Sequence, residues 1–379
     1  ERAVMIRVLH VIGAMDRGGA ETMVMNLYRA VDKSRMQFDF LVHEERECDY
    51  DQEILDLGGR IYRVPRFTGA NLIAYKKDCR RLFAEHPEHR IVHGHIGSSA
   101  AIYLKEAKRA GRVAIAHSHA QNYLPGVEGL VFDLIAHPTR NIADWFFACS
   151  KEAGIDRFGE KVVEGDRFAV LDNGIDVERY RCDEEGHRAA KERLGLAGKP
   201  VFGHVGRLSP EKNHEFLFEV FSLLKERIPD AILLLIGRGP LEQELRERAD
   251  AMGIGDSVKF LGVRDDVPAL LKAMDVFVFP SVKEGLAMAV EAQAAGLPCI
   301  VSTGVPEHAV VSDRVRHLPL EDGAASWAQN AWEAFADAKD KPRTDCVEQV
   351  RAGGFDIAAT SLRLQSFYER LANGEKAVF

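Results

Sequence analysis

Two cationic side chains lie close together in a loop that should open a helix. Arg207 and Lys212 are five positions apart in GRLSPEKN (residues 206–213), directly after the apolar run Val201–Val205. Cations that converge at the start of a helix suit a diphosphate, because guanidinium, ammonium and helix amide donors all favour negative charge. Without a metal, they would neutralise the charge that develops on a departing diphosphate. The alternative interpretation is that both are solvated surface charges. The glycine, proline and asparagine of this loop argue against that alternative.

A pair of glycines, Gly18 and Gly19, follows the first strand-like run in the segment GAMDRGGAET. Glycines allow a sharp turn and a close approach of the backbone to a ligand, and the amides of the following helix start would then point at an anion such as a donor phosphate. A plain strand-to-helix turn is the competing interpretation. The spacing does not match G-x-G-x-x-G, which argues against a dinucleotide-dependent dehydrogenase.

Two H-x-H segments also follow strand-like runs, His93-Gly94-His95 and His117-Ser118-His119. The carboxyl ends of parallel strands are where open α/β sheets bind ligands. We expect His119 to contact the reacting group, with His117 as the second choice. Paired histidines could instead bind a metal, so a metal-dependent hydrolase is an alternative. Such an enzyme would need further histidine and aspartate ligands at strand ends, and the second half of the chain offers few. Both pairs could also be ordinary polar loop residues.

Two carboxylates flank the start of an alanine-rich helix after the run Val276–Phe279. Glu284 belongs to a tight loop with Gly285 and Leu286, and Glu291 lies within the expected helix, residues 286–295. Carboxylates suit sugar and ribose hydroxyls, because each can accept several hydrogen bonds. An exposed helix residue is the alternative for Glu291, although an unpaired carboxylate on a buried helix would be costly.

Two further loops carry weaker signals. Gly237 follows a strand-like run in Gly-Arg-Gly-Pro and could line a nucleotide cleft. Val263 follows the next such run and could offer its backbone groups to a base. Each is more often part of a simple loop.

These residues need parallel sheets to bring them together. Short runs that are apolar on both faces alternate with amphipathic helical stretches such as residues 21–31 and 214–227, the pattern of βαβ units. The runs cover residues 7–12, 39–42, 60–64, 91–93, 114–117, 145–148, 201–205, 231–236, 258–261, 276–279 and 299–302. The alternation stops between about residues 177 and 199. The sequence therefore predicts an α/β protein with two Rossmann-like domains and mostly parallel sheets.

Composition limits the functional classes. The chain has 379 residues, 46% of them hydrophobic, and a formal net charge of −8, which does not favour a nucleic-acid partner. Its six cysteines are scattered, as expected for reduced thiols in a cytoplasmic protein. We find no signal peptide and no apolar run of the ~20 residues that a membrane span needs. The basic run KKDCRR (residues 76–81) reads as a solvated helix face that could touch acidic lipid headgroups.

Ten segments together resemble the retaining GT-B glycosyltransferases of family 4, particularly the bacterial exopolysaccharide and capsule enzymes. In chain order they are GGAE, IVHGH, IAHSH, ACSKEAG, NGID, VGRLSPEKNHEFL, LLIGRGP, FLGVRDDVPALL, DVFVFPSVKEGL and EAQAAGLP. The resemblance implies two facing Rossmann-like domains with a nucleotide sugar between them. It implies an acceptor-side domain of residues 1–178 plus 356–379, completed by the terminal helix, and a nucleotide-sugar domain of residues 179–355.

The resemblance also implies roles for the residues above. Arg207 and Lys212 would hold the diphosphate, Glu284 and the Gly285–Leu286 backbone would contact the donor sugar, and Glu291 would bind the ribose. His119 would contact the sugar from the other domain, with Gly19 near the phosphates. The family usually places one residue more between the two glutamates than the six found here. A one-residue deletion turns a helix by about 100°, so it alters the sugar pocket unless the loop absorbs it.

The expected activity is metal-independent transfer of a hexose-type sugar, from a donor that is a UDP-sugar by resemblance, with retention at the anomeric carbon. No cofactor is expected. The acceptor is unknown; a lipid-linked oligosaccharide would bring the enzyme to the inner face of the membrane, and a small soluble molecule remains open. A non-catalytic protein that binds nucleotide sugars is the second alternative, because of the shortened loop.

Overall fold

The computed structural model describes residues 5–119, 131, 134–284 and 286–379. The chain forms two compact units, Glu1–Gly174 with Ile357–Phe379, and Ile175–Asp356. The expected boundaries at residues 178 and 356 lie a few positions away. The difference has a local cause, because Ile175 already donates its amide to the Phe355 carbonyl and pairs with Asp356 in an isolated parallel bridge.

The first unit is built on a parallel sheet of seven strands in the order β3-β2-β1-β4-β5-β6-β7. The strands are β1 (Ile6–Ile12), β2 (Met36–Val42), β3 (Ile61–Arg63), β4 (His89–Gly94), β5 (Val113–Ser118), β6 (Trp145–Ala148) and β7 (Phe168–Val170). The sheet order reverses between β1 and β4, and this is the position at which open α/β sheets bind ligands.

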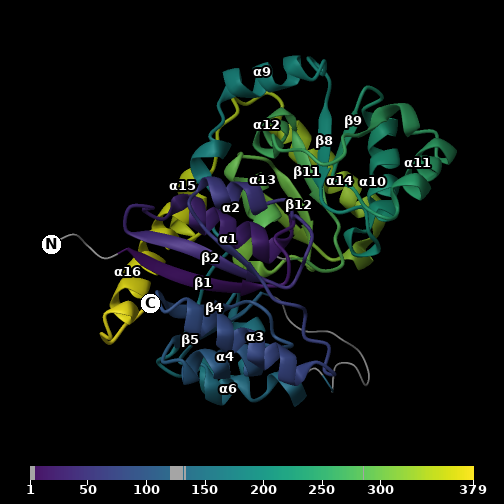
Figure 1. Cartoon of the computed structure of the whole chain (residues 1–379). Coiled ribbons are helices and arrows are strands. Elements are labelled where there is room, and N and C mark those ends of the chain that lie inside the picture. Colours follow the sequence, from purple (N-terminus) through teal and green to yellow (C-terminus); the bar gives the residue numbers. More distant parts are fainter. Residues whose placement is uncertain (1–4, 120–130, 132–133, 285) are drawn as a thin grey trace. The chain divides into compact units, whose positions relative to one another are not determined.

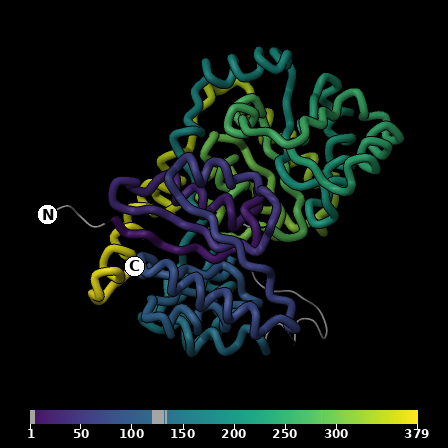
Figure 2. The backbone as a smooth tube through the Cα atoms, in the orientation of Figure 1, coloured from purple at the N-terminus to yellow at the C-terminus, as the bar shows by residue number. Residues whose placement is uncertain are grey.

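Helices connect these strands. They are α1 (Gly19–Ala30), α2 (Asp51–Asp56), α3 (Leu72–Glu85), α4 (Ala100–Arg109), α6 (Thr139–Ile142), α7 (Lys151–Phe158), α8 (Glu160–Val163) and the terminal α16 (Ile357–Ala372). The last helix packs on α1, β1 and β4, and it lies beside the N-terminal strands in both views (Figure 1, Figure 2). Its buried Leu364, Phe367 and Tyr368 form an apolar stripe on one face of the helix.

The second unit repeats the plan with six parallel strands in the order β10-β9-β8-β11-β12-β13. Its strands are β8 (Val201–Val205), β9 (Ile232–Ile236), β10 (Val258–Phe260), β11 (Val276–Phe279), β12 (Cys299–Ser302) and β13 (Val315–Leu318). Its helices are α9 (Glu184–Arg193), α10 (His214–Arg227), α11 (Glu242–Ala251), α12 (Val267–Ala273), α13 (Ala287–Ala294), α14 (Gly323–Ala338) and α15 (Val347–Ala352). Short 3-10 turns include η1 (Val177–Tyr180) and η2 (Pro210–Lys212).

The predicted fold class is confirmed, and every predicted strand is present. Two edge strands, β7 and β13, were missed. Both are short and only partly buried, so they lack the continuous apolar character that identifies a central strand. Within the described residues, no helix combines the length and apolar character needed to span a membrane.

Candidate functional site

The two charged loops of the second unit meet at the carboxyl ends of β8 and β11. The Lys212 ammonium forms an ion pair with the Glu284 carboxylate, with side-chain exposures of 17% and 7%. It also lies 5.6 Å from the ring centre of Phe279, the last residue of β11. The sequence marked Lys212 and Glu284 separately, and the structure brings them into contact.

Local backbone geometry explains this meeting. The turn η2 ends at Asn213, which adopts a left-handed conformation (φ 56°) before α10 begins at His214. The side-chain amide of Asn213 donates to the Pro280 carbonyl at 3.2 Å, and the backbone amide of Val282 donates to the Glu211 carbonyl at 2.8 Å. Asparagine tolerates the left-handed region better than most residues, so the loop after β8 can be tied to the loop after β11.

Arg207 is exposed in the same loop, and Gly237 supports the backbone beside it. Gly237 has a φ of 132°, and a Cβ there would overlap the Gly206 carbonyl oxygen. Only glycine fits this conformation and this contact. The structure therefore gives Gly237 a packing role next to Arg207. Its contact with the nucleotide stays a prediction.

The remaining predicted positions of this edge differ in their surroundings. Val263 is 55% exposed in the loop after β10, and its neighbour Gly262 accepts a hydrogen bond from the Gly237 amide. Leu286 precedes α13 and buries its side chain in the core, so only its backbone could face a ligand. Gly285 lies outside the described residues.

Glu291 lies in α13 beside Tyr180 of η1. Burial raises the pKa of Glu291 to about 7, and a hydrogen bond from the Tyr180 hydroxyl and the charge of Arg179 oppose this rise. The sequence did not mark Tyr180, because a tyrosine in a polar connecting segment carries no recognisable pattern.

Two buried histidines next to Lys212 were also missed. His204 in β8 and His214 at the start of α10 have ring centres 4.7 Å apart. Neither ring nitrogen of His214 has a hydrogen-bond partner among the described residues. Burial lowers the pKa of His214 to about 4, so the ring is neutral at pH 7.

The first unit places five histidines together at the carboxyl ends of β1, β4 and β5. Hydrogen-bond contacts join His10 Nδ1 to His95 Nε2 at 2.9 Å and His95 Nδ1 to His119 Nε2 at 2.6 Å. A second chain joins His117 Nδ1 to His93 Nε2 at 3.2 Å and His93 Nδ1 to the hydroxyl of Tyr368 in α16 at 2.5 Å. We call these five rings the histidine cluster.

Every ring of the histidine cluster is neutral at pH 7. Burial lowers the pKa of His10 to about 3 and that of His119 to about 4, and it holds the pKa values of His93, His95 and His117 well below 6.5. Desolvation disfavours the charged imidazolium, and neighbouring rings would repel one another if charged.

The contacts also favour one tautomer of His119. His10 Nε2 is buried without a partner in the described part of the chain, and an unpaired lone pair costs less there than an unpaired N–H. With its proton on Nδ1, His10 donates to His95 Nε2, and His95 Nδ1–H donates to His119 Nε2. The remaining proton of His119 is then on Nδ1.

The cluster satisfies one requirement of the metal alternative. Two sets of three rings, His10 with His93 and His95, and His95 with His117 and His119, each offer ring nitrogens within 4.8 Å of one another. Neutral imidazoles are the form that binds a metal. The geometry alone therefore does not separate a metal site from a hydrogen-bonding site.

The glycine pair lies at the start of α1, where Gly18 is the residue before the helix and Gly19 its first residue. Gly18 precedes α1 with φ −112°, and its amide donates to the Asp16 carbonyl at 2.8 Å, so the backbone turns tightly just before the helix without a left-handed glycine. A Cβ at Gly18 would overlap the Glu21 carboxylate, whereas nothing lies within 4 Å of a Cβ at Gly19. The open space at Gly19 would allow a ligand to approach the backbone closely, and this approach stays a prediction.

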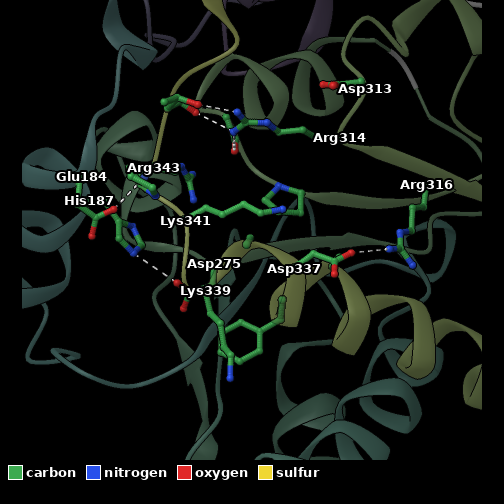
Figure 3. A pocket seen from close by; sticks show the side chains of 17 residues that line it. Glu184, His187, Asp275, Asp313, Arg314, Arg316, Asp337, Lys339, Lys341 and Arg343 are labelled. Carbon is green, nitrogen blue, oxygen red and sulfur yellow. Dashed lines mark hydrogen bonds and ion pairs between the residues drawn. The ribbon is translucent and has the colours of Figure 1, made fainter.

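A further cavity beside the second sheet lies away from these residues. A cavity of about 520 Å³ in the second unit is lined by residues that include Asp275, Arg314 and Arg343 (Figure 3). Asp275 and Arg314 precede β11 and β13, so this cavity lies at the amino edge of the sheet. Several of its charged groups bond to protein partners; the Arg343 guanidinium, for example, donates to the Met274 and Ala295 carbonyls. We interpret it as a structural feature.

Comparison with known proteins identifies both halves of the chain. The family model described as "Glycosyltransferase Family 4" matches residues 17–179, and the model "Glycosyl transferases group 1" matches residues 187–351. The two matches together include four histidines of the cluster, all except His10, and the Lys212–Glu284 pair.

Similar proteins are bacterial glycosyltransferases. The putative glycosyltransferase EpsF of Bacillus subtilis is 37% identical over 363 residues, covering 92% of this chain and 93% of its own. An Escherichia coli enzyme named UDP-Gal:alpha-D-GlcNAc-diphosphoundecaprenol alpha-1,3-galactosyltransferase is 29% identical over 316 residues, covering 75% and 78%. The crystal structure of Anabaena HepE in complex with UDP has a similar fold, with a TM-score of 0.77 at 17% identity over 97% of this chain and 100% of that one.

Proposed function

This chain belongs to the family 4 glycosyltransferases, and we propose that it moves a hexose-type sugar from a UDP-sugar to a hydroxyl acceptor with retention of anomeric configuration, in the synthesis of a bacterial surface polysaccharide or glycoconjugate. The membership and the GT-B fold confirm the resemblance seen in the sequence. The family models and relatives give the alternative of a metal-dependent hydrolase no support.

The Lys212–Glu284 pair is the observation that carries the proposal. A diphosphate at the carboxyl edge of the second sheet would approach Lys212 and the exposed Arg207, which come from one loop. When the donor binds, the diphosphate replaces Glu284 as the partner of Lys212. The Glu284 carboxylate is then available to accept hydrogen bonds from sugar hydroxyls.

The proposed reaction needs no metal. The bond between the anomeric carbon and the diphosphate oxygen breaks, and the acceptor oxygen forms a bond to the same face of that carbon. The acceptor proton passes to the departing phosphate oxygen. Arg207 and Lys212 stabilise the charge that develops on the leaving group, and such fixed charges are most effective in a partly desolvated site.

The other residues would position the donor. Glu291 would accept hydrogen bonds from the ribose hydroxyls, and Tyr180 holds its carboxylate in place. His119, with its proton on Nδ1, would donate to the sugar. Gly19 would leave room for the phosphates at the start of α1.

Two comparisons support the choice of substrates. Solved structures of the similar fold hold UDP, and one holds UDP-glucose, which favours a uridine nucleotide. The Escherichia coli relative acts by name on a diphosphoundecaprenol-linked sugar, which favours a lipid-linked acceptor. Such an acceptor would bring the enzyme to the membrane surface.

Calorimetry with UDP, GDP and ADP, in buffer containing EDTA, tests the donor site. We expect UDP to bind most tightly and Arg207→Ala to lose at least about tenfold in affinity, because charge-assisted hydrogen bonds are strong. Arg248→Ala, an exposed arginine of α11, is the matched control and should bind normally. Equal binding of UDP by wild type and Arg207→Ala would contradict the assignment.

Activity assays separate an enzyme from a non-catalytic binding protein. Incubation with UDP-sugars and EDTA, followed by NMR of the anomeric proton in the product, should show transfer or slow donor hydrolysis with the configuration retained. UDP binding with no turnover of any donor would favour the non-catalytic alternative. Turnover that EDTA abolishes and Mg²⁺ or Mn²⁺ restores would refute the metal-free mechanism.

A further inference from the structure

A small cavity in the first unit lies beside the histidine cluster. It has a volume of about 40 Å³ and is lined by the carboxyl ends of β4 and β5 together with residues of α4, α6 and α7. A water needs about 10–15 Å³ of such space, so the cavity holds roughly three waters, the size of one carboxylate or phosphate group. It is at the ligand-binding edge of the sheet and includes His119, the residue proposed to contact the sugar.

Two buried polar atoms of this lining have no hydrogen-bond partner in the described part of the chain. They are Nε2 of His117 and Oγ1 of Thr139, whose residues are 5% and 3% exposed. Leaving such atoms unpaired in a folded core costs about 1–3 kcal/mol each. Two unpaired atoms around one cavity indicate a polar ligand that pairs with both.

The chemistry of the lining selects the ligand. The Arg157 guanidinium supplies positive charge, and the lining contains no carboxylate among the residues described. The Thr139 hydroxyl and the neutral imidazole of His117 can each donate a hydrogen bond. A set of donors with one cation suits an oxyanion and does not suit a cation.

We propose that this cavity binds the negatively charged group, a carboxylate or a phosphate, of the acceptor sugar. Binding there would place an acceptor hydroxyl near His119 and thus near the reacting carbon. That the ligand is the acceptor rests on the proposed function, whereas the preference of the cavity for an oxyanion does not. The acceptor class is therefore an acidic sugar or a sugar phosphate, including one linked to a lipid diphosphate.

Thr139→Val separates a ligand-binding hydroxyl from a structural one. Valine keeps the shape and removes only the hydroxyl, so the ligand-free variant should be as stable as wild type or more stable, because an unpaired buried group is lost. Anion binding should weaken about tenfold, the effect of one hydrogen bond to a charged group. A clear fall in the melting temperature of ligand-free Thr139→Val would show that the hydroxyl already has a partner in the fold, and would overturn the proposal.

Binding is measured by calorimetry in the presence of saturating UDP, so that anions cannot occupy the nucleotide site. The probes are inorganic phosphate, glucose 1-phosphate and glucuronate, with glucose as the neutral control. We expect the anionic probes to bind wild type and glucose not to; the stronger of phosphate and glucuronate identifies the anion. Arg157→Gln should lose at least about tenfold in affinity, and Arg90→Gln, an exposed arginine at the amino edge of the sheet, should lose none.

Three results would refute the proposal: equal binding of glucose and the anions, no loss in Thr139→Val and Arg157→Gln, or anion binding that disappears when UDP is present. Failure of UDP itself to bind would instead refute the proposed donor site. The two failures are therefore distinguishable.

Discussion

The two sheets have the same strand order at their centres, yet their carboxyl edges carry opposite kinds of polar group. At the reversal between β1 and β4 the first unit places five neutral histidines. At the equivalent reversal between β8 and β11 the second unit places the Lys212–Glu284 pair and Arg207. One topology thus supplies both proposed ligand edges, and the local residues decide whether an edge offers mainly hydrogen-bonding groups or mainly charges.

The contrast follows from burial. Histidines can be enclosed because they lose their proton at a modest cost, and their pKa values fall accordingly. Lys212 and Glu284 at low exposure are instead enclosed as an ion pair, and each charge offsets the cost of burying the other. The charged edge suits a nucleoside diphosphate, and the neutral edge suits hydroxyl groups and a single anion.

The largest effect should come from breaking the charged edge. Lys212→Ala should lower turnover by about 10²–10³, because a fixed cation that stabilises the leaving group is lost. Lys199→Ala, an exposed lysine before the same strand β8, should keep wild-type turnover. Steady-state assays with a UDP-sugar decide this, and wild-type turnover in Lys212→Ala would rule out its role.

The same change should also destabilise the second unit, because the Glu284 carboxylate loses its partner at low exposure, at a cost of about 3 kcal/mol. The double variant Lys212→Ala/Glu284→Gln should recover much of the melting temperature and none of the turnover. Thermal unfolding of both variants separates the structural loss from the catalytic one.

Acid should lower the free energy of unfolding of the first unit through its buried neutral histidines. Below pH 6.5 the unfolded chain protonates histidines that remain neutral in the fold down to about pH 4 for His119 and about pH 3 for His10. The free energy of unfolding is therefore unaffected by these groups above pH 6.5. It falls below that value by up to about 1.4 kcal/mol per pH unit for each histidine.

Urea unfolding at pH 7.5, 6.5 and 5.5 measures this slope. His10→Phe replaces a titratable ring that lies against Phe38 and Phe40. The free energy of unfolding of this variant should therefore change less steeply with pH than that of wild type, by the contribution of one proton. The exposed His308→Phe should leave the slope unchanged. Identical slopes for wild type and His10→Phe would contradict the buried neutral state.

Disturbing the tautomer of His119 should have a smaller effect. His95→Ala removes the contact that orients His119, and turnover should fall about tenfold, the effect of one well-placed hydrogen bond. His95→Asn keeps a short amide that can bond to His119 and should recover part of the loss, while the exposed His137→Ala should behave as wild type. Equal turnover in His95→Ala and His95→Asn would show that packing, not the hydrogen bond, matters.

The smallest expected effect concerns Glu291. Its pKa of about 7 predicts that the KM for the donor rises as the pH falls below 7, because the protonated carboxyl accepts fewer hydrogen bonds. Tyr180→Phe removes the hydrogen bond that lowers this pKa, so the midpoint should move to higher pH and the KM at pH 7 should rise about two- to tenfold with kcat nearly constant. An unchanged midpoint would exclude a positioning role for Tyr180.

The local pattern predicted the elements well, because a buried parallel strand is apolar on both faces and a helix repeats every 3.6 residues. The predicted run 214–227 coincides with α10, and the predicted run 21–31 covers most of α1 (Gly19–Ala30). The edge strands β7 and β13 were the elements missed. A partly buried edge strand carries a weaker pattern, and glycine spacing does not reveal whether a backbone turns or merely leaves space.

The sequence by itself determined the two parallel sheets, the loops at their ends and the types of side chain placed there, since these follow from short-range periodicity. Only the tertiary structure decided which of these side chains meet. Lys212 and Glu284 are 72 positions apart, and His93 and Tyr368 are 275 apart, so their contacts depend on strand order and on the return of α16 to the first unit. The neutral state of the histidines was likewise decided by burial, a property of the assembled fold that no local pattern records.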